Sequence, residues 1–257
     1  MTIEFSGRGD PARSLALLWR TSERASRKGR PELSVERIVR AAIEVADAEG
    51  LQALSMRRVA ERLGVGTMSL YTYVPGKPEL FDVMLDEVYG ETARPDDVPG
   101  GWRGGLEQIA RENWALYLRH PWLLQVAANR PVLGPNVTAK YEYELGAVDG
   151  IGLSDLEMDS VITLITGFVH GAARGAVEAA QAESLTGLTD EQWWAAHAPF
   201  LARIADTTRY PVASRVGQAA GQELQGAYSP EHAFEFGLER ILDGIEALVA
   251  KRRTTSA

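Results

Sequence analysis

The sequence predicts an all-α protein in which a unit of three short helices precedes a larger helical body. Apolar residues recur three and four positions apart through most of the 257 residues, which is the spacing of one helix face. No segment alternates apolar and polar residues over a useful strand length. Prolines such as Pro131, Pro199 and Pro230 separate the periodic segments. We therefore expect body helices near residues 102–119, 135–149, 155–183, 190–207 and 231–251.

The composition limits the classes of protein that this chain can be. It contains no cysteine, which excludes disulfides, thiol catalysis and cysteine-based zinc sites. It shows no run of about 18 apolar residues and no secretory signal pattern, so we expect a cytoplasmic protein without a membrane partner. Residues 1–80 hold 13 Lys/Arg against 10 Asp/Glu, whereas residues 81–257 hold 14 against 25. A mildly basic front on an acidic body, with a net charge of −8, suggests two separate roles.

Residues 33–77 predict a helix-turn-helix unit. A first helix follows Ser34, which can cap it, and ends at Gly50. A second helix follows Ser55 and ends at Gly64, and the third segment, TMSLYTY, begins after only two more residues. A fourth helix, PELFDVMLDEVYGE, joins this unit to the body. In a helix-turn-helix motif the helix after the tight turn enters the major groove of DNA.

The third segment has polar and aromatic side chains that the core does not explain. Leu70 and Val74, four residues apart, can anchor it inward, so its other side chains point outward or sideways. Hydroxyl, phenol and basic groups suit phosphate oxygens and a few base edges. The alternative is a solvated turn whose tyrosines pack on their own domain. We expect DNA contacts from eight side chains of the unit: Ser55, Arg57, Thr67, Met68, Ser69, Tyr71, Tyr73 and Lys77.

The segment LSMRRVAERLGVGTMSLYTYVPGKPELFDVMLDEV resembles the DNA-binding domain of TetR-type transcriptional regulators. The shared pattern is a Ser/Thr-capped second helix, then Ala-x-x-Leu-Gly-Val, then Ser/Thr-Leu-Tyr-x-Tyr/His-x-x-x-Lys. Thr72 stands where some members carry an aromatic residue. The resemblance places seven of the side chains named above at DNA-contacting positions, all except Ser55. It also implies that the remaining two thirds of the chain form an all-helical domain that binds a ligand and dimerises.

Residues 1–32 are interpreted as a basic N-terminal arm, as in the arm-bearing actinobacterial-type subset of that family. Its basic side chains suit the minor groove of A·T-rich DNA, and the segment KGRP is similar to the core of an AT-hook. The alternative is a solvated tail. The apolar stretch LALLW could instead dock a short helix on the protein's own body. The expected DNA contacts of the arm are Arg24, Arg27, Lys28 and Arg30.

Two helices of the predicted body suit a homodimer. Small residues recur every fourth position in one of them, which lets two helices approach closely. The last helix carries a continuous apolar seam. Two such helices per chain can form a four-helix bundle across a twofold axis, with the reading helices about 34–36 Å apart on a palindromic operator. The alternative is packing within one chain. The expected interface residues are Gly167, Gly171, Gly175, Ala179, Leu238, Ile241, Leu242 and Ile245.

The body is also rich in large aromatic side chains with a few polar neighbours. An apolar space with a few polar groups is typical of a small-molecule site, and its lining suits a bulky, partly aromatic ligand. The alternative for each residue is an ordinary place in the core. The expected ligand-binding residues are Asn113, Trp114, Tyr117, Trp122, Tyr141, Phe168, His170, Trp193 and Trp194.

These features predict a ligand-responsive DNA-binding transcriptional regulator, and we favour a repressor that leaves its operator when the small molecule binds. An activator and a ligand-independent DNA-binding protein remain alternatives. The four histidines are scattered, and no HExxH, GxSxG or P-loop motif occurs, so we expect no enzyme, catalytic residue, metal or cofactor. The expected organisation is an arm at 1–32, a helix-turn-helix domain at 33–77 and a ligand-binding and dimerisation domain at 78–257.

Overall fold

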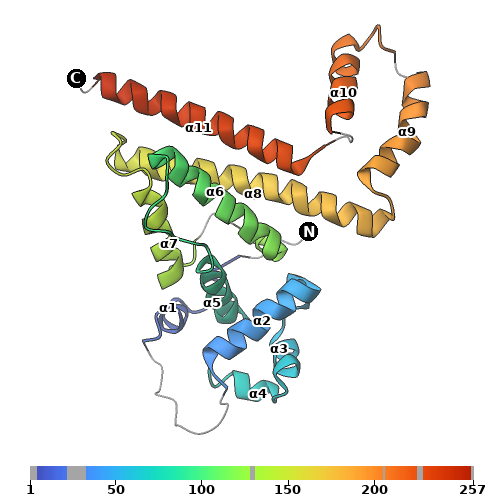
Figure 1. Cartoon of the computed structure of the whole chain (residues 1–257). Helices are drawn as coiled ribbons and strands as arrows, with labels where there is room; N and C mark the ends of the chain where they lie inside the picture. The colour runs from blue at the N-terminus through green and yellow to red at the C-terminus, as the bar shows by residue number, and fades with distance from the viewer. Residues whose placement is uncertain (1–4, 22–32, 128–130, 205, 225–227, 256–257) are drawn as a thin grey trace.

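The computed structural model describes residues 5–21, 33–127, 131–204, 206–224 and 228–255. Within these ranges the chain forms eleven α-helices and two short 3-10 helices, η1 (Leu51–Ala53) and η2 (Pro121–Gln125), and no β-strand. Figure 1 shows a small helical unit at one end, a layer of long helices above it, and a helix pair that projects from that layer. The prediction of an all-α fold is confirmed.

The small unit consists of α2 (Val35–Glu49), α3 (Met56–Leu63) and α4 (Thr67–Leu70). The Ser34 side chain accepts a hydrogen bond from the backbone N–H of Arg37 at 3.3 Å, and Ser55 accepts from that of Arg58 at 3.1 Å. Gly64 ends α3 with a φ of 68°, a left-handed conformation that glycine adopts without a steric penalty. The sequence therefore predicted the limits of α2 and α3 correctly, because local caps and stops determine them.

The third segment is a shorter helix than expected. α4 ends at Leu70, and the backbone N–H groups of Tyr73 and Val74 both donate to the Leu70 carbonyl at 2.9 Å, which closes a tight turn. Leu70 and Val74 are fully buried, as predicted, and they pack into one core with Ile38 of α2 and Val59 of α3. The core therefore fixes the orientation of the whole α4 turn.

Helix α5 (Lys77–Tyr89) joins the small unit to the body, and α1 (Pro11–Leu18) packs against it (Figure 1). Leu17 and Leu18 of α1 are buried in the common core. Residues 5–21 therefore do not belong to an arm, and the predicted arm at 1–32 was too long. The suggestion that LALLW docks a short helix on the body is confirmed, since apolar side chains on one face of a short helix bury best against a neighbour.

The body is a layer of α6 (Gly101–Arg119), α7 (Pro135–Gly146), α8 (Asp155–Thr186) and α11 (Pro230–Thr255) (Figure 1). α8 packs on both α6 and α11. Leu238, Leu242 and Ile245 of α11 are buried inside this layer. Their prediction as interface residues was wrong, because these side chains are already covered within one chain. Ile241 is only half-buried.

Two helices, α9 (Asp190–Ile204) and α10 (Pro211–Leu224), project from the body as a hairpin between α8 and α11 (Figure 1). The sequence predicted one helix over 190–207 and missed α10. The α10 segment, PVASRVGQAAGQEL, carries Val212, Val216 and Ala220 at a spacing of four, so its sequence is amphipathic, although none of its residues is buried. The sequence interpretation overlooked this short apolar stripe.

Helix α8 is the one helix of the described residues that is long and apolar enough to cross a membrane. A core helix satisfies the same criterion. Ile165, Val169 and Ala173 of α8 are buried inside the protein, which is the environment of a core helix.

Candidate DNA-reading surface and buried polar cluster

The α4 turn presents its polar and aromatic side chains to solvent. Met68 is 78% exposed and Tyr71 is 45% exposed, while Ser69 lies beside them on the same surface. Exposed apolar groups of this size on a four-residue helix have no partner in the described part of the fold. Thr67 and Lys77 are half-buried at the two ends of the turn. We call these five residues the reading surface.

Three further predicted contacts have partners of their own. The Ser55 hydroxyl oxygen caps α3 by accepting from the Arg58 N–H, and its own O–H remains available to donate. Tyr73 is half-buried and packs against the core. The Arg57 side chain pairs with Glu61 at 2.8 Å, yet it is 83% exposed and free to turn toward another anion. The basic residues Arg24, Arg27, Lys28 and Arg30 lie outside the described residues.

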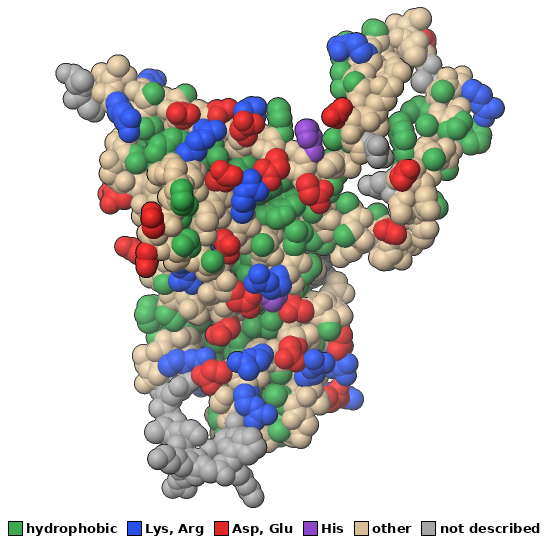
Figure 2. All heavy atoms as spheres, in the orientation of Figure 1, with side chains coloured by type: hydrophobic (Ala, Val, Ile, Leu, Met, Phe, Trp, Pro, Cys, Tyr) green, Lys and Arg blue, Asp and Glu red, His purple; other side chains and the backbone are tan. Residues whose placement is uncertain are grey.

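Ion pairs cover the side of α3 next to the reading surface. Arg58 pairs with Glu49 at 2.7 Å and with Glu61 at 3.3 Å. The hydrogen bond from Arg58 is the main cause that lowers the pKa of the Glu49 carboxyl, and hydrogen bonds from Arg57 and Arg58 lower the pKa of Glu61. Figure 2 shows Lys and Arg side chains over this end of the molecule, mixed with acidic ones.

A cluster of polar side chains lies inside the body between α5, α6, α7 and α8. Lys140 of α7 is 8% exposed and forms an ion pair with Glu144, one helical turn later, which is 4% exposed. Asn113 of α6 donates to Glu144 at 3.0 Å. The Lys140 ammonium lies 5.8 Å from the ring centre of Tyr89, the last residue of α5. A cation above an aromatic ring in a dry site is stabilised by the ring.

Two tyrosines and a histidine complete this polar cluster. Tyr89 and Tyr117 lie close enough to influence each other's ionisation, and desolvation is the main cause that raises the pKa of both phenols. The Tyr117 ring meets the His170 ring edge-on with 5.5 Å between their centres. Desolvation, and then the Arg174 charge, lowers the pKa of His170. We define the polar cluster as Tyr89, Asn113, Tyr117, Lys140, Glu144 and His170.

Two atoms of the polar cluster are buried without a hydrogen-bond partner among the described residues. They are Oδ1 of Asn113 and Nε2 of His170. Leaving a buried polar atom unpaired costs about 1–3 kcal/mol, so proteins keep few of them without a reason. A ligand that offers a hydroxyl group could satisfy Asn113 and relieve this cost.

A second polar network joins the small helical unit to the body. His120, at the end of α6, is buried, with Nδ1 2.7 Å from Asp47 of α2 and Nε2 3.1 Å from Glu91. The Trp122 indole N–H also donates to Asp47, at 2.8 Å. His120 thus places one ring nitrogen against each of two carboxylates from different parts of the chain. This domain junction fixes α2 relative to the body.

The structure brings together some of the predicted ligand-binding residues but not all. Asn113, Tyr117 and His170 meet in the polar cluster. Trp114 and Phe168 lie nearby in a different group, where both rings contact Phe234 of α11, with ring centres 4.4 and 6.0 Å away. These five residues line the interior of one layer.

Four other predicted ligand-binding residues are elsewhere. Trp122 belongs to the domain junction, where its N–H is used. Tyr141 is on the surface and donates to Asp159 at 2.7 Å. Trp193 and Trp194 stack on each other on the projecting hairpin, away from the polar cluster in this chain. Aromatic residues alone did not distinguish core, surface and hairpin, because all three environments accept them.

The sequence interpretation missed Tyr89, Lys140 and Glu144 as members of the polar cluster. The pair Lys140–Glu144 has the spacing of one helical turn, which on its own is typical of a solvated helix face. Burial comes from α5 and α6, which lie against α7 only after folding. It also missed Asp47 and Glu91, since their shared partner, His120, is far from both in sequence.

The small-residue face of α8 is partly open. Added side-chain carbons at Gly167 and Gly171 would meet no atom within 4 Å, whereas one at Gly175 would lie 2.9 Å from the Tyr228 hydroxyl. Ala179 is half-buried. Gly167 and Gly171 therefore offer room for another helix, but Gly175 is already covered within the chain.

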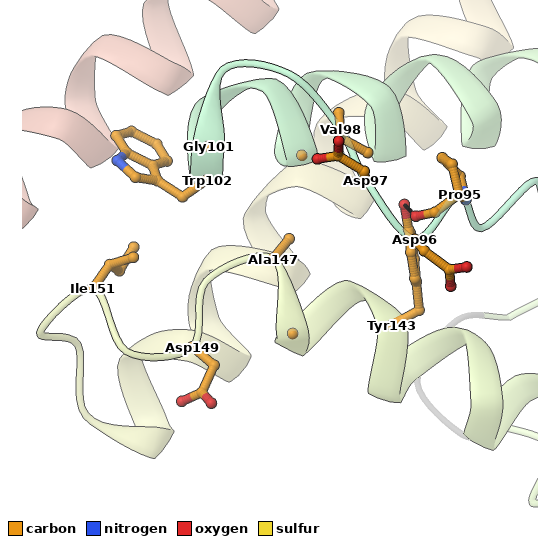
Figure 3. Close-up of a pocket in the computed structure, with 12 residues that line it drawn as sticks. Pro95, Asp96, Asp97, Val98, Gly101, Trp102, Tyr143, Ala147, Asp149 and Ile151 are labelled. Atoms are coloured by element: carbon orange, nitrogen blue, oxygen red, sulfur yellow. Dashed lines mark hydrogen bonds between the residues drawn. The ribbon is translucent and has the colours of Figure 1, made fainter.

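A cavity of about 530 Å³ lies apart from the polar cluster, between the start of α6 and the end of α7. Figure 3 shows Asp97, Val98 and Trp102 on the α6 side, and Ala147 and Asp149 on the α7 side. The volume suits a small molecule, but the space is a broad surface hollow. Nothing buried and unpaired lines it, in contrast to the polar cluster.

Comparisons with known proteins agree with this geometry. A family model described as "Tetracyclin repressor-like, C-terminal domain" matches residues 94–249, and one described as "Bacterial regulatory proteins, tetR family" matches residues 38–84. The HTH-type transcriptional repressor DrrR1 of Streptomyces coeruleorubidus is 50% identical over 258 residues, covering 100% of this chain and 93% of that protein.

Solved structures of proteins with similar sequences have a similar fold. ActR of Streptomyces coelicolor in complex with actinorhodin is 30% identical, with a TM-score of 0.70 over 85% of this chain and 97% of that one. ActR in complex with (S)-DNPA is also 30% identical, with a TM-score of 0.66 over 84% and 98%. Both comparisons extend over the small unit and the body together.

Proposed function

Since the chain belongs to the TetR family of transcriptional regulators, as its sequence resemblance predicted, we propose that it is a cytoplasmic repressor released from DNA by a small molecule. The reading surface of each protomer binds one half of a palindromic operator, and the effector binds at the polar cluster. The observation that carries this proposal is the position of α5. Lys77, its first residue, belongs to the reading surface, and Tyr89, its last, belongs to the polar cluster.

The chemistry of the polar cluster limits the effector. It must offer a hydrogen-bond donor to Oδ1 of Asn113 and a polar atom to Nε2 of His170, and it must stack among aromatic rings. A bulky, hydroxylated, partly aromatic molecule meets these needs. The relative ActR has been solved with actinorhodin and with (S)-DNPA, which makes these two compounds the first probes to use.

The response requires that the effector bind the released form better than the DNA-bound form, since equal affinity would shift nothing. A coupling free energy of about 1–3 kcal/mol is usual for such regulators. Movement of Tyr89 is transmitted along α5 to Lys77, and the domain junction around His120 limits how far α2 can follow. The effector thereby changes the placement of the reading surface.

A second copy of the chain completes the proposal. Gly167 and Gly171 leave α8 open to a close helix neighbour, and the projecting hairpin continues from the same helix. The hairpin exposes Phe200, Ile204 and Val216, at 61, 79 and 50%. Several large apolar side chains exposed on one projecting element are typical of an interface. Figure 2 shows hydrophobic side chains on the hairpin.

The test is fluorescence anisotropy with a labelled DNA fragment from upstream of the protein's own gene and a scrambled duplex. We expect preference for the native fragment, and release when actinorhodin or (S)-DNPA is added. Tyr117→Phe removes one hydroxyl of the polar cluster and should weaken release without weakening DNA binding. Tyr141→Phe, which changes a surface hydroxyl, is the matched control.

Equal binding to both duplexes would contradict sequence-specific reading at this locus. Release that is unchanged in Tyr117→Phe would place the effector elsewhere. Failure of both compounds to release DNA from a protein that reads its fragment would exclude this effector class and leave the DNA-binding proposal intact.

A further inference from the structure

Residues Phe5–Thr21 pack on the connecting helix α5, although they precede the helix-turn-helix unit in the chain. This N-terminal segment was first interpreted as part of a DNA-binding arm, and the proposed function gives it no role. Its backbone and side chains contact three separate elements of the fold. These contacts indicate a structural role for the segment in positioning α5.

One face of α5 carries three buried carboxylates. Glu79, Asp82 and Asp86 are 7, 3 and 4% exposed, and their spacing places them along one side of the helix. We call these three residues the acidic ledge. Buried carboxylates are rare unless their oxygens have hydrogen-bond donors.

The acidic ledge holds two chain segments through their backbones. Asp82 accepts from the N–H of Gly7 at 2.9 Å, and Glu79 accepts from the N–H of Asp10 at 3.2 Å, which fixes the N-terminal segment. Asp86 accepts from the N–H groups of Asn136 and Val137, at 3.3 and 2.9 Å, which fixes the start of α7.

At both places an added side chain would force a buried carboxylate to shift. A carbon added at Gly9 would lie 2.5 Å from Glu79 Oε1, and one added at Gly134 would lie 2.2 Å from Asp86 Oδ1. Glycine permits this approach of backbone to carboxylate. The two segments are therefore pressed onto the same helix at neighbouring positions.

The N-terminal segment also reaches past α5 on both sides. The Trp19 indole N–H donates to the Leu133 carbonyl in the loop before α7, at 2.9 Å. Arg20 pairs with Glu36 of α2, at 3.4 Å. One continuous segment thus contacts the small unit, the connecting helix and the body.

We propose that residues Phe5–Thr21 are a brace that holds α5 in the arrangement in which the reading surface fits DNA. The segment ties α5 to the loop before α7 on the body side and to α2 on the DNA side. Loosening it lets α5 change its angle, and the free protein then spends less time in the form that fits DNA. A smaller competent fraction lowers the apparent affinity in proportion.

The experiment uses the full-length protein and two variants of the brace. Trp19→Phe removes the hydrogen bond to Leu133 and keeps an aromatic ring, while Leu17→Ala removes a buried side chain that is 8% exposed. Leu15→Ala is the matched control, because the Leu15 side chain is on the same helix and is 40% exposed. Circular dichroism verifies that all three remain folded.

The first readout is amide hydrogen exchange, which reports local opening. We expect amide exchange in residues 77–89 and 131–137 to be faster than in the wild type for Trp19→Phe and Leu17→Ala. For Leu15→Ala we expect the wild-type exchange rate. The second readout is anisotropy with the upstream DNA fragment. We expect Trp19→Phe to bind DNA about threefold more weakly, which corresponds to the net free energy of one modest hydrogen bond. Leu17→Ala should lose more DNA affinity.

Unchanged exchange in α5 and in 131–137 for both variants would overturn the brace. So would tighter DNA binding, which would make the segment an inhibitor, or faster exchange with unchanged affinity, which would make it structural only. The affinity readout rests on the proposed function, but the exchange readout does not. A wild-type protein that shows no preference for its upstream DNA therefore contradicts sequence-specific reading at this locus, while the exchange pattern still decides whether the segment holds α5 in place.

Discussion

The small helical unit and the projecting hairpin are both built from short helices, yet they differ in what holds them. In the unit, Ile38, Val59 and Leu70 from three helices are each 0% exposed. In the hairpin, α10 has no buried residue, and Ile204 of α9 is 79% exposed. The first region buries its apolar side chains within one chain, and the second leaves them outside.

The difference shows how much each region depends on a partner. Helices this short are marginal in water unless an apolar face is buried. The unit meets that requirement within its own chain, through a core shared with α5. The hairpin leaves its apolar side chains exposed in one chain, and we expect a second copy of the chain to cover them. The following predictions test this contrast.

Leu70→Ala should have the largest effect. The side chain is fully buried where α4 meets α2 and α3, so its removal leaves a cavity and should lower the free energy of unfolding by about 2–5 kcal/mol. Urea denaturation followed by circular dichroism measures this. A loss below about 1 kcal/mol would mean that the unit collapses around the gap and is less tightly packed than the structure shows.

Lys77→Ala should weaken DNA binding by about fivefold and reduce the salt slope by about one unit, as expected for one lost phosphate contact. Arg203→Ala on α9 removes the same charge from the hairpin and is the control. Anisotropy titrations at several salt concentrations measure both. Equal losses in the two variants would show that overall charge matters, rather than the reading surface.

The dependence of stability on pH should have opposite signs at two places. Burial raises the pKa of Asp82 and Asp86, so their contribution is fully present below about pH 4, their ordinary range, and is lost as pH rises through the raised values. Hydrogen bonds from Arg58 and Arg57 lower the pKa of Glu49 and Glu61, whose contribution is lost as pH falls.

Asp86→Asn separates these effects. Its stability relative to the wild type should rise between pH 4 and pH 7, measured by urea denaturation. Glu49→Gln should become relatively less stable as pH rises from acid toward the ordinary glutamate pKa of 4.5, and should change little above it. A flat difference for Asp86→Asn would show that the hydrogen bonds from Asn136 and Val137 offset the cost of burial.

Phe200→Ser should have the smallest effect on the protomer, within about 0.5 kcal/mol, because the side chain is 61% exposed. It should raise the dissociation constant of the dimer, measured by sedimentation equilibrium. A protomer that unfolds more easily, with dimerisation unchanged, would mean that the hairpin supports its own chain instead of a partner.

The sequence predicted the regions in which structure is determined locally. Ser34, Ser55 and Gly64 act through their own neighbours, so the limits of α2 and α3 could be predicted. The polar cluster could be predicted only in part, since the burial of Lys140 and Glu144 depends on helices that are distant in sequence. The seam of α11 was identified as apolar, but periodicity does not say whether such a seam meets its own chain or another.

In the proposed mechanism, helix α5 is a rigid lever. Its 13 residues span about 20 Å at 1.5 Å per residue, without an internal glycine or a break. A tilt of about 10° about one end would displace the other by about 3 Å, close to the length of one hydrogen bond. A sub-ångström adjustment near the pivot is therefore enlarged before it reaches DNA. Few atoms need to move in the body for an entire set of groove contacts to lose their alignment.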